Sequence, residues 1–91
     1  MVCSNGGSVL HFAAEGGNVD IIKCFSENGL DVNAVDNDGV TSLHRASWAG
    51  KTNAAIELLR LGANKAVVAG SYGTPLHQAS IRGHFDTVLA L

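Results

Sequence analysis

The 91-residue sequence has few cysteines, few aromatic residues and little charge, and these shortages exclude several classes of protein. Its two cysteines, Cys3 and Cys24, are too few for a small secreted fold held together by disulfides. Six basic residues against eight acidic ones leave no positive surplus for binding nucleic acid. Apolar runs are far shorter than the about 20 residues of a membrane span, and residues 1–7 do not resemble a signal peptide. We therefore expect an intracellular protein, cytoplasmic or nuclear, without membrane insertion.

The motifs of common catalytic sites are also missing. No G-x-x-x-x-G-K-[ST], G-x-S-x-G or H-E-x-x-H pattern occurs. The acidic segment around Asp31, Asp36 and Asp38 lacks the final glutamate of a calcium-binding EF-hand loop, so we expect it to form turns. The sequence therefore predicts that the chain is not an enzyme and that it holds no cofactor and no metal.

What the sequence does contain is an internal repeat with a period of 33 residues. The segments 8–13, 41–46 and 74–79 align at this offset as S-V-L-H-F-A, T-S-L-H-R-A and T-P-L-H-Q-A. The residues that coincide are the histidines His11, His44 and His77, the glycines Gly17, Gly50 and Gly83, and the pair Gly29 and Gly62. Agreement at several independent positions indicates tandem structural units.

Each unit is typical of two short helices joined by a tight turn. The hydroxyl residues Ser8, Thr41 and Thr74 are placed to cap the first helix, and Pro75 suits its first turn. The histidines then occupy the third helical position, where the side chain can bond back to the cap. Stacked helices lie about 8–10 Å apart, which is too far for the three histidines to share one metal ion.

The rest of each unit follows the same physical pattern. Glycines 17, 50 and 83 end the first helix, and His84 is expected at the tight turn. A second amphipathic helix follows, in which Cys24 is expected to be buried. A long turn rich in Asp, Asn and Gly closes the unit. Because such short helices are marginal alone, neighbouring units must bury one another's apolar faces.

A 33-residue period with T-P-L-H-x-A at the start of a helix resembles the ankyrin repeat. The segments 31–34 (D-V-N-A) and 36–41 (D-x-x-G-x-T) are also similar to that family. The resemblance covers a partial leading segment (1–7), two full repeats (8–40 and 41–73) and a truncated third repeat (74–91). It implies an all-α solenoid in one domain (1–91), built of stacked helix-turn-helix units with β-hairpin-like finger loops.

Three features depart from the family's pattern. In the second long turn Ala69 and Tyr72 replace the usual Asp and Gly, so this finger is predicted to lose its turn chemistry. Ile56 and Glu57 stand where a polar residue followed by an apolar one is usual. No polar capping repeat is recognisable at either end, which predicts self-association through the ends.

The resemblance implies a protein or peptide partner, held in a concave groove of finger tips and first-helix faces. The groove positions in this sequence are Glu15, Asn37, Asp38, Val40, Trp48, Val68, Tyr72, Ile81 and Arg82. Trp48, the only tryptophan, is the favoured anchor, and the alternative is that it merely covers the stack. Two further hypotheses are hydroxylation of Asn33 by an intracellular asparaginyl hydroxylase and a structural piece of a larger ankyrin-repeat scaffold or regulatory protein. Phe25, where a leucine is commonly expected, weakens the hydroxylation hypothesis.

Overall fold

The computed structural model of the chain describes residues 6–27, 29, 31–36 and 38–91, with backbone alone for residues 6–9. The helices of the first two units are α1 (Gly6–Glu15), α2 (Val19–Glu27), α3 (Ser42–Ala49) and α4 (Thr52–Arg60). A short 3-10 helix, η1 (Gly70–Tyr72), precedes α5 (Pro75–Arg82) and α6 (Phe85–Ala90). Within these described ranges the regular structure is entirely helical. None of the described helices is long and apolar enough to cross a membrane.

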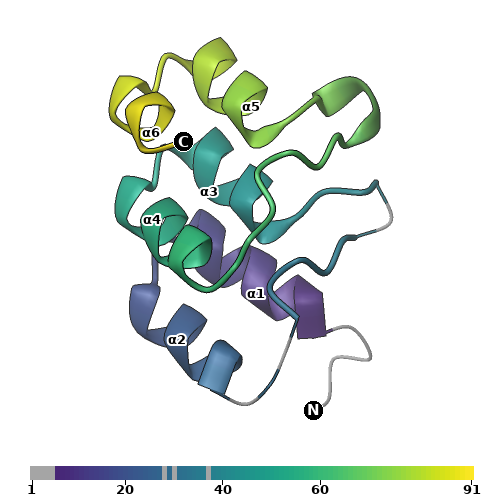
Figure 1. Cartoon of the computed structure of the whole chain (residues 1–91), viewed down its shortest axis with the longest axis vertical. Coiled ribbons are helices and arrows are strands. Elements are labelled where there is room, and N and C mark those ends of the chain that lie inside the picture. Colours follow the sequence, from purple (N-terminus) through teal and green to yellow (C-terminus); the bar gives the residue numbers. More distant parts are fainter. Residues whose placement is uncertain (1–5, 28, 30, 37) are drawn as a thin grey trace.

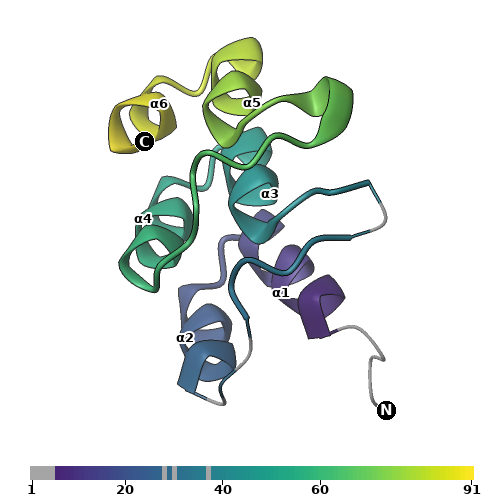
Figure 2. The same cartoon turned by 45° about the vertical axis from the view of Figure 1, so that its right-hand side comes forward.

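The described helices form pairs that stack along the longest axis of the molecule (Figure 1). The first helices α1, α3 and α5 make one layer, and the second helices α2, α4 and α6 make the other (Figure 2). Within the layers α3 packs between α1 and α5, and α4 packs between α2 and α6. The two long loops project to one side of this stack (Figure 1). The predicted all-α solenoid is therefore confirmed.

Hydroxyl and imidazole groups define where α3 and α5 begin. The Thr41 hydroxyl accepts the backbone N–H of His44 at 3.3 Å, and His44 Nδ1 accepts the backbone N–H of Thr41 at 3.2 Å. Thr74 and His77 form the same reciprocal pair at 3.3 and 3.2 Å. These capping boxes satisfy N–H groups that a helix start otherwise leaves without partners.

Glycines end the first helices, and at Gly17 and Gly50 the missing side chain also lets the next unit approach closely. Gly17, Gly50 and Gly83 are left-handed, with φ of 74°, 71° and 74°, a conformation that only glycine adopts without cost. A Cβ on Gly50 would lie 2.6 Å from the imidazole of His84, which belongs to the next unit. His84 Nε2 in turn bonds the carbonyl oxygen of Trp48 at 2.9 Å. The predicted turn residue His84 thus also joins the second unit to the third.

The core is built largely from small side chains, which allow the stacked helices to lie close together. The buried cluster comprises Leu10, Ala13, Ala14, Ile22, Val32, Leu43, Ala46, Ala54, Ala55 and Leu58. In α4 the unusual order of Ile56 and Glu57 has a structural consequence, because Ile56 is 42% exposed whereas Glu57 is only 6% exposed. The Glu57 carboxylate is held by Arg60 at 2.9 Å. A carboxylate therefore occupies an inward position that an apolar side chain would fill in the expected order.

The second finger loop keeps its closure although its side chains have changed. In the first finger the N–H of Asp36 donates to the carbonyl of Val40 at 3.0 Å, and in the second Ala69 donates to Gly73 at 2.9 Å. Asp36 Oδ1 also caps the first turn, whereas the second turn is formed by the 3-10 helix η1. Ala69 cannot make the side-chain hydrogen bonds of Asp36, as the sequence predicts, and a different local structure closes this finger at the same place.

Two local predictions are wrong. The helix α1 begins at Gly6, so Ser8 lies inside it and is not its cap. Thr41 and Thr74, in contrast, have extended backbones and follow loops closed by backbone hydrogen bonds. Cys24 is exposed, not buried. Its equivalent Glu57 is buried with units stacked on both sides, whereas within this chain the unit of Cys24 has a neighbour on one side only.

Candidate functional site

A cleft of about 170 Å³ opens between the two finger loops and the adjacent side of the first-helix layer. It is lined by Asp38 and Val40 from the first finger, His44, Arg45 and Trp48 from α3, Tyr72 from the second finger and Gln78 from α5. These residues come from three successive units, so the cleft exists only because the units stack. Its size suits one large side chain of a partner more than a folded element.

Two half-exposed aromatic rings dominate the cleft. Trp48 is 40% exposed and Tyr72 is 49% exposed, although both are large enough to be favoured in a core. The guanidinium carbon of Arg82 lies 4.4 Å from the centroid of the Trp48 ring, a cation–π distance. Both aromatic types are enriched at the centres of protein interfaces, where they supply contact area with little conformational freedom to lose.

His44 lines the cleft and is held in place by hydrogen bonds at both ring nitrogens. Its Nδ1 accepts the N–H of Thr41, so in the neutral ring the proton lies on Nε2, which donates to the carbonyl of Gly73 at 2.8 Å. Burial lowers the pKa of His44, and the carbonyl of Gly73 only partly offsets this effect. The imidazole is therefore a neutral, doubly bonded structural group, and neither ring nitrogen is open to a ligand.

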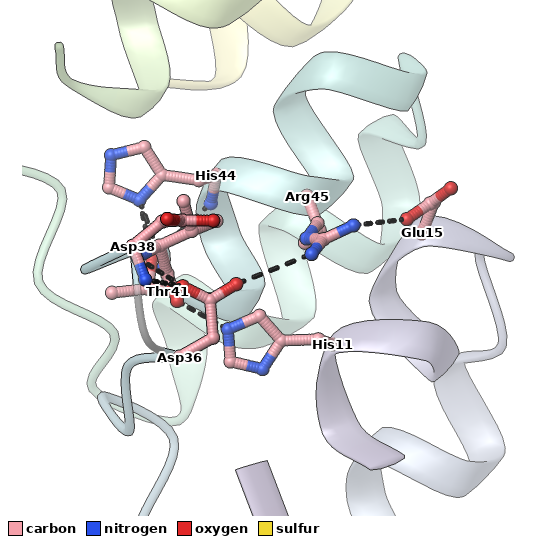
Figure 3. Close-up of polar contacts among 8 residues, drawn as sticks. His11, Glu15, Asp36, Asp38, Thr41, His44 and Arg45 are labelled. Atoms are coloured by element: carbon pink, nitrogen blue, oxygen red, sulfur yellow. Dashed lines mark hydrogen bonds and ion pairs between the residues drawn. The ribbon is translucent and has the colours of Figure 1, made fainter. Parts of the chain in front are cut away.

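Arg45 lies on one wall between two carboxylates (Figure 3). Its Nη1 is 3.0 Å from Glu15 Oε1 in the first unit, and its Nη2 is 3.3 Å from Asp36 Oδ2 in the first finger. Burial alone would raise the pKa of Asp36, but the backbone N–H groups of Val40 and Asp38 and the guanidinium of Arg45 together hold this pKa below its ordinary value. The wall thus carries two carboxylates for one guanidinium.

The first finger is held in place from both sides. Asp36 Oδ1 accepts the backbone N–H groups of Asp38 and Val40 at 2.9 and 3.0 Å. The carbonyl of Val40 also accepts a hydrogen bond from His11 Nε2 in the first unit. Val40 is only 9% exposed and lines the cleft.

The predicted groove residues fall into four groups. Asp38, Val40, Trp48 and Tyr72 meet in the cleft. Of the others, Glu15 and Arg82 touch cleft residues from outside, Val68 and Ile81 are exposed but do not line the cleft, and Asn37 lies outside the described residues. The sequence reasoning missed Arg45 and Gln78. Spacing could have found Arg45, because it lies three residues before Trp48 and so shares a helix face with it.

Asn33, the candidate for modification, bridges two units. Its side-chain N–H donates to the carbonyl of Gly62 at 3.2 Å, and its side-chain oxygen accepts the N–H of Asn64 at 2.7 Å. The amide is thus used at both ends to align the first long turn with the second. In the described part of the chain no group of three or more His, Cys, Asp or Glu side chains is placed to hold a metal ion.

Comparison with known proteins agrees with this architecture. The family model of ankyrin repeats in three copies matches residues 1–69. The chain is 42% identical over 69 residues to the fowlpox virus ankyrin repeat protein FPV014, covering 76% of this chain and 16% of that protein. It is 34% identical over 87 residues to human BCL-6 corepressor-like protein 1, covering 94% of this chain and 5% of that protein.

Among solved structures, the ankyrin repeat domain of human ASB11 superposes with a TM-score of 0.82 at 35% identity. The match covers 88% of this chain and 36% of the ASB11 chain. The present chain thus spans only a small part of the relatives it matches. Its period, its helix pairs and these matches agree, and the chain belongs to the ankyrin repeat family.

Proposed function

We propose that the chain is a non-catalytic module that captures a peptide segment of a partner protein in the cleft around Trp48 and Tyr72. Ankyrin repeats are protein–protein interaction modules, and this fold is generally not catalytic. The observation that carries the proposal for this chain is the pair of half-exposed aromatic rings, presented together where two finger loops meet two helices. Large exposed apolar groups gathered in a concave site are typical of binding surfaces.

The rigidity of the cleft supports the same function. His44 is bonded at both ring nitrogens, Arg45 is held by two carboxylates, and Gln78 bonds the carbonyl of Tyr72. Side chains that are already fixed lose little conformational entropy when a partner binds. The stack therefore presents the two aromatic rings in one arrangement and leaves most of the ordering cost to the peptide.

A peptide selection tests this proposal. Peptides of random sequence would be selected on the immobilised chain and their affinities measured for the wild type, Trp48→Ala and Leu89→Ala. Leu89 is a matched control because it is 84% exposed on α6, away from the cleft. We expect Trp48→Ala to weaken the selected peptides by at least about tenfold, as for an interface hot spot, with thermal unfolding nearly unchanged and Leu89→Ala without effect. Equal losses in the two variants, or none, would contradict the proposal.

A second candidate interaction is self-association through the exposed end of the stack. In the middle repeat Leu43, His44 and Ser47 are buried because α5 packs over them. Their equivalents Leu76, His77 and Ser80 are all exposed, and the exposed fraction of the Leu76 residue is 45%. At the other end Phe12 is 73% exposed at the position equivalent to Arg45. We infer that these two ends stack head to tail between copies of the chain, in an open arrangement that does not close on itself.

Sedimentation at rising protein concentration tests the stacking of copies. Leu76→Lys should shift the chain towards the monomer because it places a charge in the stacked face. Leu89→Lys is the control, since Leu89 is more exposed but corresponds to Ile56, which remains 42% exposed with a neighbour on each side. A chain that stays monomeric, or that responds equally to both variants, would show that the ends do not bind one another.

A further inference from the structure

We propose that the cleft selects peptides by an arginine side chain, whose guanidinium binds between the aromatic rings and the Asp38 carboxylate. This inference rests on the proposed function, because it names the chemistry that the same cleft prefers. It follows from the balance of charge in the cleft, from the hydrogen-bond acceptors that remain open, and from the shape of the aromatic surfaces.

The charges around the cleft favour a cationic occupant. Arg45 is the only basic side chain that lines it apart from the neutral imidazole of His44. Both terminal nitrogens of Arg45 are already engaged, by Glu15 and by Asp36. Together with Asp38, the cleft and the charged groups in contact with it carry three carboxylates for the two guanidinium groups of Arg45 and Arg82, a net charge of 2 − 3 = −1. An acidic side chain would therefore be repelled and a basic one attracted.

The open polar groups of the cleft are mainly acceptors. Within the described part of the chain the backbone of Asp38 is bonded to Asp36, but its exposed carboxylate has no hydrogen-bond donor. Gln78 uses its side-chain N–H on the carbonyl of Tyr72, which leaves its side-chain oxygen for a ligand. Tyr72 can accept a further bond at its hydroxyl. A ligand that satisfies these groups must bring several donors, as a guanidinium does.

The aromatic surfaces favour a flat cation over a compact one. The guanidinium of Arg82 lies over one face of the Trp48 ring, 4.4 Å from its centroid, so that face is already occupied. Arg82 does not line the cleft, so Trp48 borders the cleft with other parts of its surface. A guanidinium stacks on aromatic faces while its edge donates to a carboxylate, whereas an ammonium is a strongly hydrated point charge. Arginine therefore fits this combination better than lysine.

The test uses three capped tripeptides, with arginine, lysine or the neutral arginine isostere citrulline between two glycines. Each is titrated into the whole chain, and the indole N–H signal of Trp48 is followed by NMR, since no other tryptophan is present. We expect the arginine peptide to shift this signal saturably. The citrulline peptide should bind at least about tenfold more weakly because it lacks the charge that strengthens the hydrogen bonds, and the lysine peptide should also be weaker than the arginine peptide.

Two variants locate the carboxylate that matters. Asp38→Asn should weaken the arginine peptide by at least about fivefold, with thermal unfolding unchanged because the carboxylate makes no bond to any described residue. Asp86→Asn is the control, since Asp86 is an equally exposed carboxylate in the first turn of α6, outside the cleft. Equal binding of the arginine and citrulline peptides, equal binding of the arginine and lysine peptides, or equal effects of the two variants would overturn the inference.

The two proposals can fail separately. If selected peptides depend on Trp48 but contain no arginine, the cleft binds peptides and the preference for arginine is wrong. If no selected peptide depends on Trp48, the proposed function itself is wrong, whatever the tripeptides do.

Discussion

The Nε2 atom of His44 lies 2.8 Å from the carbonyl oxygen of Gly73, the residue directly before the third repeat begins. The other ring nitrogen lies 2.8 Å from the hydroxyl of Thr41, the cap of its own helix. One imidazole therefore joins the start of a helix to the end of the loop that leads into the next repeat, and His11 makes the same link to Val40 one repeat earlier. The glutamate of an ordinary capping box could not do this, because it supplies acceptors and no donor.

Replacing His44 and, separately, His77 should distinguish the stability that comes from capping a helix from the stability that comes from the further bond to the loop. His44→Ala should lower the free energy of unfolding by about 2–4 kcal/mol, because it removes a cap, a buried hydrogen bond and buried volume. His77→Ala should cost only about 1 kcal/mol, because His77 has the same cap contacts but is exposed. Urea denaturation of the two variants measures the difference. Equal losses would mean that the bond to Gly73 contributes nothing to stability.

The same residue predicts how stability depends on pH. Burial lowers the pKa of His44 in the folded chain, whereas the unfolded chain takes up this proton near pH 6.5. Below about pH 6.5 the unfolded state binds more protons, so stability is lost as the pH falls towards the pKa of the folded state. Thermal unfolding at pH 7.5 and 5.5 should show a lower midpoint at pH 5.5, and His44→Gln should reduce this drop. The lowered pKa of Asp36 acts in the same direction but only near pH 4 and below.

The sequence predicts the fold well because the evidence for it recurs. Thr41, His44 and Gly50 are readable as cap, third position and helix end, and their equivalents 33 residues later have the same roles. Such local chemistry needs no knowledge of distant contacts. Trp48 and Tyr72 could be assigned to the groove side by register alone, although no register shows that they share a cleft with Gln78.

What the sequence does not predict depends on neighbours. Cys24 and Glu57 share a register position, yet one is exposed and the other buried, because the second has a repeat on each side. Likewise the Arg45 side chain is positioned by its ion pair with Glu15, which belongs to the preceding repeat. These outcomes are set by packing between units, which the pattern within one unit does not contain.

The glycines at the helix ends predict a steric test. Gly50→Ala should destabilise the chain by about 2–4 kcal/mol, because a left-handed alanine is strained and its Cβ would lie 2.6 Å from the His84 ring. Gly83→Ala has almost the same φ, 74° against 71°, but no atom lies within 4 Å of the added Cβ. It should cost only the strain, about 1–2 kcal/mol.

The double variant Gly50→Ala with His84→Ala checks that the clash is the cause. It should be less unstable than the sum of the two single variants, because the ring that collides with the new methyl group is gone. Chemical denaturation of the four variants and the wild type gives this comparison. If Gly50→Ala and Gly83→Ala lose the same stability, backbone strain alone explains both.

Ser42 offers a way to make the chain more stable. Its hydroxyl is completely buried and, among the described residues, makes no hydrogen bond, which is a cost to the fold. The equivalent residue of the next repeat is Pro75, also buried and at the first position of its helix. Thr41 has φ −94° and ψ 170°, close to the −89° and 167° of Thr74, so its backbone already suits a following proline.

Ser42→Pro should therefore raise the free energy of unfolding by about 1–2 kcal/mol. Part of the gain comes from removing the unbonded hydroxyl, and about 0.4–1 kcal/mol comes from restricting the unfolded chain. Ser42→Ala is the matched control, since it removes the hydroxyl without restricting the backbone and should give only the first part. Thermal and urea unfolding of both variants measure the two contributions. A loss of stability in both would show that the hydroxyl of Ser42 has a role in the folded chain, and a loss in the proline variant alone would show that the backbone at this position differs from that at Pro75.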